Sequence, residues 1–179
     1  GIALMYMPQD LKAYFGPNMA ALRTGTGSSF FWEHQRMDAD AKKEINLNTA
    51  GCIVRGWQES YKGKVGHPDT FIIPSADIRL DGRGDKGGKF AEMLALHQKH
   101  NALVSIALAP VPWKDVFRFG VVHQQGASYD AKTGRQILGS AGRFAKIDRF
   151  EEKLPHAKSN LNNASVYIVS ERLVELIED

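Results

Sequence analysis

Cysteine is nearly absent from this sequence: Cys52 is the only one among 179 residues. A single thiol excludes an internal disulfide framework and is typical of a reducing compartment, so we expect a cytoplasmic protein. Long apolar runs are also absent, since none approaches the ~20 residues that cross a bilayer. The first residues lack the basic start and long apolar centre of a secretory signal. These absences argue against a secreted disulfide-rich domain and against a membrane partner.

An excess of charge of one sign is missing as well. The 23 Lys and Arg residues are nearly balanced by 20 Asp and Glu residues, which leaves a formal net charge of +3. Nucleic-acid-binding domains carry a clustered basic surface instead, so we expect no nucleic-acid partner. Hydrophobic residues make up 43% of the chain and charged residues 24%. This composition predicts a single globular domain, residues 1–179, with a sizeable core.

Strand and helix patterns alternate along the chain, which is typical of an α/β fold. Residues 89–100 have helical spacing, and strands at 71–76 and 103–108 flank them, which predicts a β-α-β unit of a parallel sheet. One face of this helix carries Phe90, Met93, Leu94 and His97. Further strands are expected at 1–7, 30–33, 119–122, 145–150 and 163–170, and further helices at 8–15, from Thr49 onward and at 171–179. The portion between Phe119 and Phe150 is rich in strands and is expected to be antiparallel.

Asp77 follows directly on the apolar run at residues 71–76. In open α/β sheets, ligands bind at the edge formed by the carboxyl ends of the strands. A carboxylate at this edge suits Mg²⁺, which prefers a few hard oxygen ligands and keeps water and phosphate as the rest. The alternative is an Asx-turn that begins the following loop.

Three other short clusters are candidates for binding. Thr49, Ala50 and Gly51 stand at a predicted helix start, where free N–H groups attract phosphate, although such residues also simply cap helices. Glu152 and Lys153 suit hydroxyls and a phosphate, or they form an ordinary solvated surface. The amide-rich stretch at residues 159–164 offers donors and acceptors to a polyol, or it forms a turn.

Taken in order, these segments resemble the nucleotidyltransferases that make nucleoside-diphosphate sugars, and the likeness covers most of the chain. The segments that carry it are Tyr6 to Gly16, Asn48-Thr49-Ala50-Gly51, Ile72 to Asp77, Ala102 to Val111, Phe119 to Val122, Phe150 to Lys153 and Ser159 to Val169. The resemblance implies a three-layer, Rossmann-like α/β fold with a mixed, mainly parallel central sheet. It also implies a nucleotide-side portion at residues 1–100 and a sugar-binding portion at residues 101–179.

The resemblance implies transfer of a nucleotidyl group from a nucleoside triphosphate to a sugar 1-phosphate, with release of pyrophosphate. Positioning and charge neutralisation would supply most of the catalysis. On the nucleotide side, Asp77 would be the catalytic residue that holds Mg²⁺. The nucleotide itself would be approached by Thr49, Ala50 and Gly51.

On the sugar side, the resemblance implies four binding residues. Glu152 would accept sugar hydroxyls, and Lys153 would neutralise the sugar phosphate. Gly120 and Asn163 would shape the sugar pocket. Two further positions depart from the family, because Ala76 and Ser165 stand where it has glycine, and each adds bulk where backbone would approach a ligand.

Two segments of the family pattern have no counterpart in this sequence. By the resemblance, the glycine-rich triphosphate loop would lie before Gly1, and the second metal-binding aspartate would lie beyond Asp179. We therefore expect an incomplete fold in which a complementing chain or a second copy fills the gap, because unpaired sheet edges are unfavourable. We also expect no pyrophosphorylase activity from this chain alone. The alternative function is a non-catalytic module of the same fold that binds a sugar phosphate, a nucleotide or another protein.

Overall fold

The computed structural model describes about two thirds of the chain. The described residues are 2–4, 31–33, 35–37, 44–46, 50–51, 53–54, 57–58, 62, 69–75 and 88–178. The chain divides into two compact units, Gly1–Pro68 with Val174–Asp179 and Asp69–Leu173. The single domain and its division at residue 100 stay predictions. Within the described ranges, no helix has the length and apolar character needed to cross a membrane.

The first unit contains two pairs of short strands. Strand β1 (Ile2–Leu4) pairs in parallel with β2 (Phe31–Glu33), which confirms the strands predicted in these two regions. Strand β3 (Gln35–Met37) pairs antiparallel with β4 (Glu44–Asn46), a hairpin that the sequence pattern did not predict. The predicted helix at residues 8–15 lies outside the described residues.

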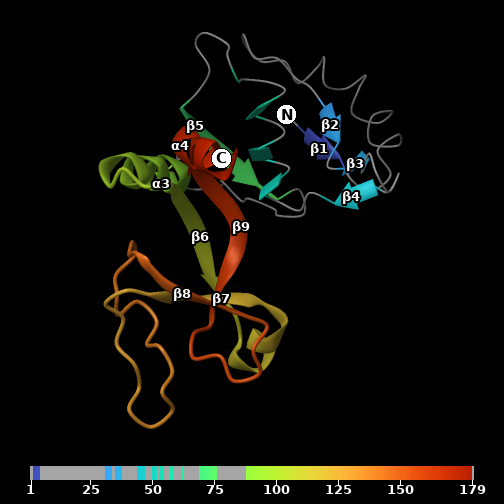
Figure 1. The fold of residues 1–179 in the computed structure, drawn as a ribbon. Coiled ribbons are helices and arrows are strands. Elements are labelled where there is room, and N and C mark those ends of the chain that lie inside the picture. Colours follow the sequence, from blue (N-terminus) through green and yellow to red (C-terminus); the bar gives the residue numbers. More distant parts are fainter. Residues whose placement is uncertain are drawn as a thin grey trace. The chain divides into compact units, whose positions relative to one another are not determined.

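The second unit is built on a five-stranded sheet (Figure 1). Its elements are β5 (Thr70–Pro74), α3 (Gly88–Lys99), β6 (Val104–Pro110), the 3-10 helix η1 (Trp113–Arg118), β7 (Gly120–Gln124), β8 (Ile147–Glu152) and β9 (Leu161–Ser170). Helix α4 (Glu171–Glu178) begins directly after β9. Every one of these strands and helices was predicted within a few residues, and only η1 was missed.

The α/β class is confirmed, but the strand pairing requires a correction. A mainly parallel sheet was expected, whereas every pairing in the five-stranded sheet is antiparallel. Strands β5 and β6 do run in the same direction, as the β-α-β pattern predicts, because both are antiparallel to β9. Val169 of β9 pairs with Phe71 of β5 and also with Val104 of β6, so β9 lies between them. Periodicity identifies strands, but it does not reveal that the last strand returns between two earlier ones.

Strand β9 is central because strands occupy both of its edges. Strand β6 runs along one edge and pairs with both halves of β9. The opposite edge is shared by β5, which pairs with residues 166–170, and by β7, which pairs at Asn162. A short stretch of this edge, residues 163–165, lies between the two. Figure 1 shows β9 running beside β6 from α4 to β7.

The core of this unit includes residues of the two inner strands, β7 and β9. Val121, Val122 and Ile168 have no exposed surface at all, and they belong to β7 and β9, which lie inside the sheet. Each strand contains consecutive apolar residues, Val121-Val122 in β7 and Val166 to Val169 in β9, as expected where a strand is covered on both faces. These buried side chains therefore hold β7 and β9 in their places within the sheet.

Candidate functional site

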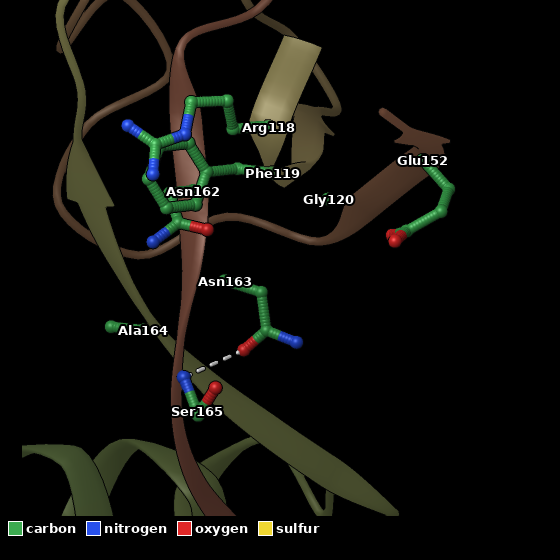
Figure 2. Close-up of a pocket in the computed structure, with 8 residues that line it drawn as sticks. All are labelled: Arg118, Phe119, Gly120, Glu152, Asn162, Asn163, Ala164 and Ser165. Carbon is green, nitrogen blue, oxygen red and sulfur yellow. Dashed lines mark hydrogen bonds between the residues drawn. The ribbon is translucent and has the colours of Figure 1, made fainter. Parts of the chain in front are cut away.

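A pocket of about 350 Å³ opens at residues 163–165 of β9, in the stretch between β5 and β7. It is lined by the end of η1, the start of β7, the end of β8 and the bulged part of β9. The lining residues are Arg118, Phe119, Gly120, Glu152, Asn162, Asn163, Ala164 and Ser165 (Figure 2). Three of the predicted sugar-side residues, Gly120, Glu152 and Asn163, come together here from three different strands.

Gly120 and Glu152 are paired directly across β7 and β8. A Cβ atom added to Gly120 would overlap with Oε2 of Glu152, and no backbone atom lies within 4 Å of it. The absence of a side chain at position 120 therefore gives the Glu152 carboxylate its place at the pocket. The side chain of Glu152 is 70% exposed, so its oxygens are accessible to a ligand.

The amide of Asn163 is held in a fixed orientation by two neighbours on the same strand. Its Oδ1 accepts a hydrogen bond of 2.9 Å from the backbone N–H of Ser165, drawn in Figure 2. Its Nδ2 donates to the Tyr167 hydroxyl at 2.8 Å. Each amide atom keeps capacity for one further hydrogen bond. Asn163 is thus a preorganised polar group at the pocket with one donor and one acceptor to spare.

Ser165 adopts a backbone conformation that favours glycine, with φ of 54°. It lies at the irregularity where the register between β6 and β9 shifts. The left-handed region costs a residue with a Cβ atom roughly 1–2 kcal/mol. Ser165 is also the position at which the resembled family has glycine, so the structure supplies the physical reason for that glycine.

We expect Ser165→Gly to raise the free energy of unfolding by about 0.5–1 kcal/mol, because relief of the left-handed strain exceeds the entropy that glycine gains in the unfolded chain. Urea unfolding followed by circular dichroism measures this change. Ser165→Ala is the matched control, since it removes the hydroxyl but keeps the Cβ atom. Equal stability of the two variants would show that the Cβ atom carries no strain.

Lys153 is the predicted sugar-side residue that does not line the pocket. Its Nζ lies 3.4 Å from Oε1 of Glu152, and its side chain is 66% exposed. Its backbone is left-handed, with φ of 52°, and its N–H donates to the Phe119 carbonyl at 3.0 Å. Lys153 therefore contacts the site through Glu152 and through the backbone next to Gly120.

One lining residue, Arg118, was missed by the sequence analysis. Phe119 is part of the segment that carries the family resemblance, but Arg118 precedes it and was not singled out. The only signal available was its place directly before the Phe119-Gly120 pair. Its side chain reaches the pocket because η1 ends at this residue and β7 begins two residues later.

Not all of the amide-rich stretch belongs to the site. Ser159 is fully buried, and its hydroxyl donates to the Val122 carbonyl at 2.6 Å. Asn160 donates from Nδ2 to the Val111 carbonyl at 2.9 Å. These two residues hold the entry to β9, and the turn alternative is wrong, because residues 159–160 form no turn and residues 161–164 belong to β9. Only residues from Asn162 onward line the pocket.

The position of β8, which carries Glu152, is secured by Glu151 on its inner side. Oε2 of Glu151 lies 3.0 Å from Nε2 of the buried His123 and accepts a hydrogen bond of 3.0 Å from the Lys158 backbone N–H. Burial raises the pKa of Glu151, but these interactions and Arg149 outweigh it and hold the pKa below its ordinary value. The charged carboxylate thus stabilises the β7–β8 pair at neutral pH.

The nucleotide-side residues are described only in part. Ala50 and Gly51 are helical, as expected of residues at a helix start, and Ala50 is exposed. Thr49 and Asp77 lie outside the described residues. Strand β5, which precedes Asp77, ends beside the pocket, because the Ser75 N–H donates to the Ser165 carbonyl at 2.9 Å. Across the described part of the chain, no group of three or more His, Cys, Asp or Glu side chains could hold a metal ion.

Several known enzymes are similar to this chain in sequence. Glucose-1-phosphate adenylyltransferase of Lachnospira eligens is 32% identical over 181 residues, which cover 98% of this chain and 35% of the relative. The same enzyme of Acetivibrio thermocellus is 30% identical over 175 residues, or 94% of this chain and 33% of the relative. Mannose-1-phosphate guanyltransferase of Yarrowia lipolytica is 34% identical over 109 residues, covering 60% of this chain and 23% of the relative. The chain thus spans about a third of the first two relatives.

Solved structures support the fold. An apo UDP-glucose pyrophosphorylase superposes with a TM-score of 0.58 at 17% sequence identity, over 99% of this chain and 61% of the other. A UTP-bound enzyme of this kind from Acinetobacter baumannii gives a TM-score of 0.56 over 96% of this chain and 51% of the other. The nucleotidyltransferase fold expected from the sequence is thereby confirmed. The model of the family described as "Nucleotidyl transferase" matches residues 24–179, so the chain belongs to this nucleotidyltransferase family.

Proposed function

We propose that the pocket binds the sugar 1-phosphate substrate of a sugar-1-phosphate nucleotidyltransferase. The observation that carries this proposal is the convergence of Gly120, Glu152 and Asn163 on one pocket from three strands. The sequence motifs predict the same three residues as sugar-binding residues. Relatives that act on glucose 1-phosphate and mannose 1-phosphate point to the same class of substrate.

The pocket offers the groups that such a ligand requires. Sugar hydroxyls need acceptors and donors, and the Glu152 carboxylate and the Asn163 amide supply both. The backbone at Gly120 leaves room for the sugar ring, because no side chain projects there. The phosphate requires positive charge, and the cationic residues at the site are Arg118 and Lys153.

In the proposed reaction, an oxygen of the sugar phosphate attacks the α-phosphorus of a nucleoside triphosphate, and the bond to the pyrophosphate leaving group breaks. The described residues would contribute binding and orientation of the attacking group. Nucleotide contacts from Thr49, Ala50 and Gly51 remain part of the proposal. So does a role for Asp77 as a ligand of Mg²⁺, which would neutralise phosphate charge when bound.

We also retain the proposal of a cytoplasmic location, of a homo-oligomer or a complementing chain, and of no nucleic-acid or membrane partner.

A non-catalytic sugar-phosphate-binding module is the second candidate. It is favoured by Ser165, which lines the pocket and whose backbone has a left-handed conformation suited to glycine. Pyrophosphate release from a nucleoside triphosphate, Mg²⁺ and glucose 1-phosphate would favour the transferase. Binding of glucose 1-phosphate without pyrophosphate release agrees with both candidates, because no activity is expected from this chain alone.

Glu152→Gln tests the pocket directly. We expect this variant to bind glucose 1-phosphate about 10-fold more weakly, because glutamine keeps the shape but loses the charge that strengthens hydrogen bonds to hydroxyls by roughly 1.5 kcal/mol. Isothermal titration calorimetry measures the affinity. Glu175→Gln is the control, since Glu175 is exposed on α4 and does not line the pocket. Failure of the unmodified chain to bind glucose 1-phosphate would contradict the proposed function.

A further inference from the structure

We propose that Tyr129 is a nucleophilic site that accepts an acyl group from an activated ester or thioester, with His123 as its general base and Glu151 as the residue that positions that base. The inference does not rest on the proposed function, because none of these three residues lines the pocket. It gives a role to a buried histidine that the proposed nucleotidyl transfer does not use.

The first argument is the contact between a phenol and a buried base. The hydroxyl of Tyr129 lies 2.8 Å from Nδ1 of His123 on strand β7. His123 has no exposed surface, so water does not compete for this nitrogen. A hydroxyl within about 2.6–3.2 Å of a base that a third group orients is the signature of nucleophilic catalysis.

The second argument is the carboxylate on the other side of the ring. Oε2 of Glu151 lies 3.0 Å from Nε2 of His123, and across the described residues Nε2 has no hydrogen-bond partner that competes with this carboxylate. A lone pair on Nε2 would be repelled by the carboxylate, so in the neutral ring the proton lies on Nε2. Nδ1 is then the acceptor of the Tyr129 proton. The charge of Glu151 also stabilises the imidazolium that forms when this proton is transferred.

The third argument is that the phenol is both accessible and fixed. Tyr129 is 41% exposed, although its base is fully buried. Its backbone forms an antiparallel bridge with Gln136. The Gln136 side chain accepts a hydrogen bond of 3.2 Å from the backbone N–H of Gln124, the residue after His123. Tyr129 is therefore held beside its base while part of the residue stays open to a reagent.

The class of donor follows from the arrangement, because a hydroxyl, a histidine and a carboxylate in this order perform acyl transfer in unrelated folds. The Tyr129 oxygen attacks the carbonyl carbon of the ester and forms a new C–O bond. The phenol proton passes to Nδ1 of His123, and the bond to the alcohol or thiol leaving group breaks. The leaving group takes this proton from the imidazolium, which regenerates the base. The product is an aryl ester of Tyr129, and the step needs no oxidant or reductant.

Acetylation of the full 179-residue chain by p-nitrophenyl acetate tests this inference. We expect Tyr129 to react about 100-fold faster than Tyr167 and about 10-fold faster than free N-acetyltyrosine amide, because a positioned base accelerates proton transfer about 10²–10⁴-fold. Tyr167 is the comparison within the molecule, since its hydroxyl is bonded to the Asn163 amide rather than to a base. Peptide mass spectrometry measures the rate at each tyrosine. A rate at Tyr129 no higher than that of N-acetyltyrosine amide would overturn the proposal and show that the contact only anchors the loop.

Variants of the two supporting residues assign their roles. His123→Gln should slow the acetylation of Tyr129 about 100-fold, since glutamine forms hydrogen bonds but takes up no proton. Glu151→Gln should slow it about 10-fold, and Glu151→Asp should restore part of the rate because it restores the charge. Asp148→Asn is the matched control, since Asp148 is an exposed carboxylate on the same strand.

Thermal unfolding verifies that each variant is folded. An unchanged rate at Tyr129 in folded His123→Gln would overturn the role of the base. Equal losses of rate in Glu151→Gln and Asp148→Asn would overturn the role of Glu151. The comparison with N-acetyltyrosine amide uses the unmodified chain, so it decides the proposal even if a variant of a buried residue fails to fold.

Discussion

Gly120→Ala is expected to reduce the affinity for glucose 1-phosphate about 100-fold without loss of stability. The added Cβ atom overlaps only with the end of the Glu152 side chain, which is 70% exposed and free to rotate away. Two charge-assisted hydrogen bonds to sugar hydroxyls would be lost with the displaced carboxylate, a change of about 3 kcal/mol. Calorimetric titration measures this loss.

The stability of the same variant is expected to stay equal or to rise. Glycine in a strand costs about 0.5–1 kcal/mol relative to alanine, and no backbone atom lies near the new methyl group. Urea unfolding should therefore show no destabilisation. Large losses of both affinity and stability would mean that Gly120 is required for folding and would remove it from the list of binding residues.

Gly139→Ala is the matched control, with the opposite pattern of effects. Gly139 has φ of 78° and no atom within 4 Å of an added Cβ, so alanine there is strained but meets no steric clash. We expect a loss of about 1 kcal/mol in unfolding free energy and unchanged affinity for glucose 1-phosphate. The two glycines thus separate a binding role from a conformational one.

The second large effect concerns His97, which we expect to make the chain less stable in mild acid. The imidazole is 2% exposed on α3, with Nδ1 3.0 Å from the Ser105 hydroxyl and Nε2 3.0 Å from the Ser170 hydroxyl. Ser170 donates its own proton to the Ala102 carbonyl at 2.6 Å, so it accepts from Nε2–H. Nδ1 is then the acceptor of the Ser105 proton. The neutral ring is fully satisfied in this arrangement.

Burial lowers the pKa of His97 below its ordinary value of 6.5. Below that pH the unfolded chain binds a proton that the folded chain does not yet bind, so the free energy of unfolding decreases as the pH falls. The decrease reaches at most about 1.4 kcal/mol per pH unit and ends at the folded-state pKa. Urea unfolding at pH 7.5, 6.5 and 5.5 measures the slope.

His97→Gln should reduce this slope and should also lower the stability at pH 7.5 by about 2 kcal/mol, because at least one buried hydroxyl loses its partner. His156→Gln is the control, since His156 is exposed and should leave the slope unchanged. A slope in His97→Gln as steep as that of the unmodified chain would assign the acid sensitivity to other groups. Glu151 contributes at lower pH, because its stabilisation is lost only as the pH falls through its depressed pKa.

The candidate site was predictable where short motifs resemble those of the family. Gly120, Glu152 and Asn163 each belong to such a motif, so the resemblance predicted all three. Arg118 escaped notice because a single arginine in a polar turn is usually solvated. Lys153 was expected at the phosphate, yet its proximity to Glu152 depends on the turn that follows β8. Such assignments require distances between residues from separate elements.

By itself, the sequence determined the strands and the two α-helices of the segment from β5 to α4, because hydrophobic periodicity and glycine positions are local properties of the chain. It also determined the family, through short motifs in a fixed order. The tertiary structure alone decided that β9 lies between β5 and β6 and that β5 and β7 share its other edge. Strand pairing is a long-range choice, set by which apolar faces are buried together. The pocket between β5 and β7, and the place of Arg118 in it, exist only because of that choice.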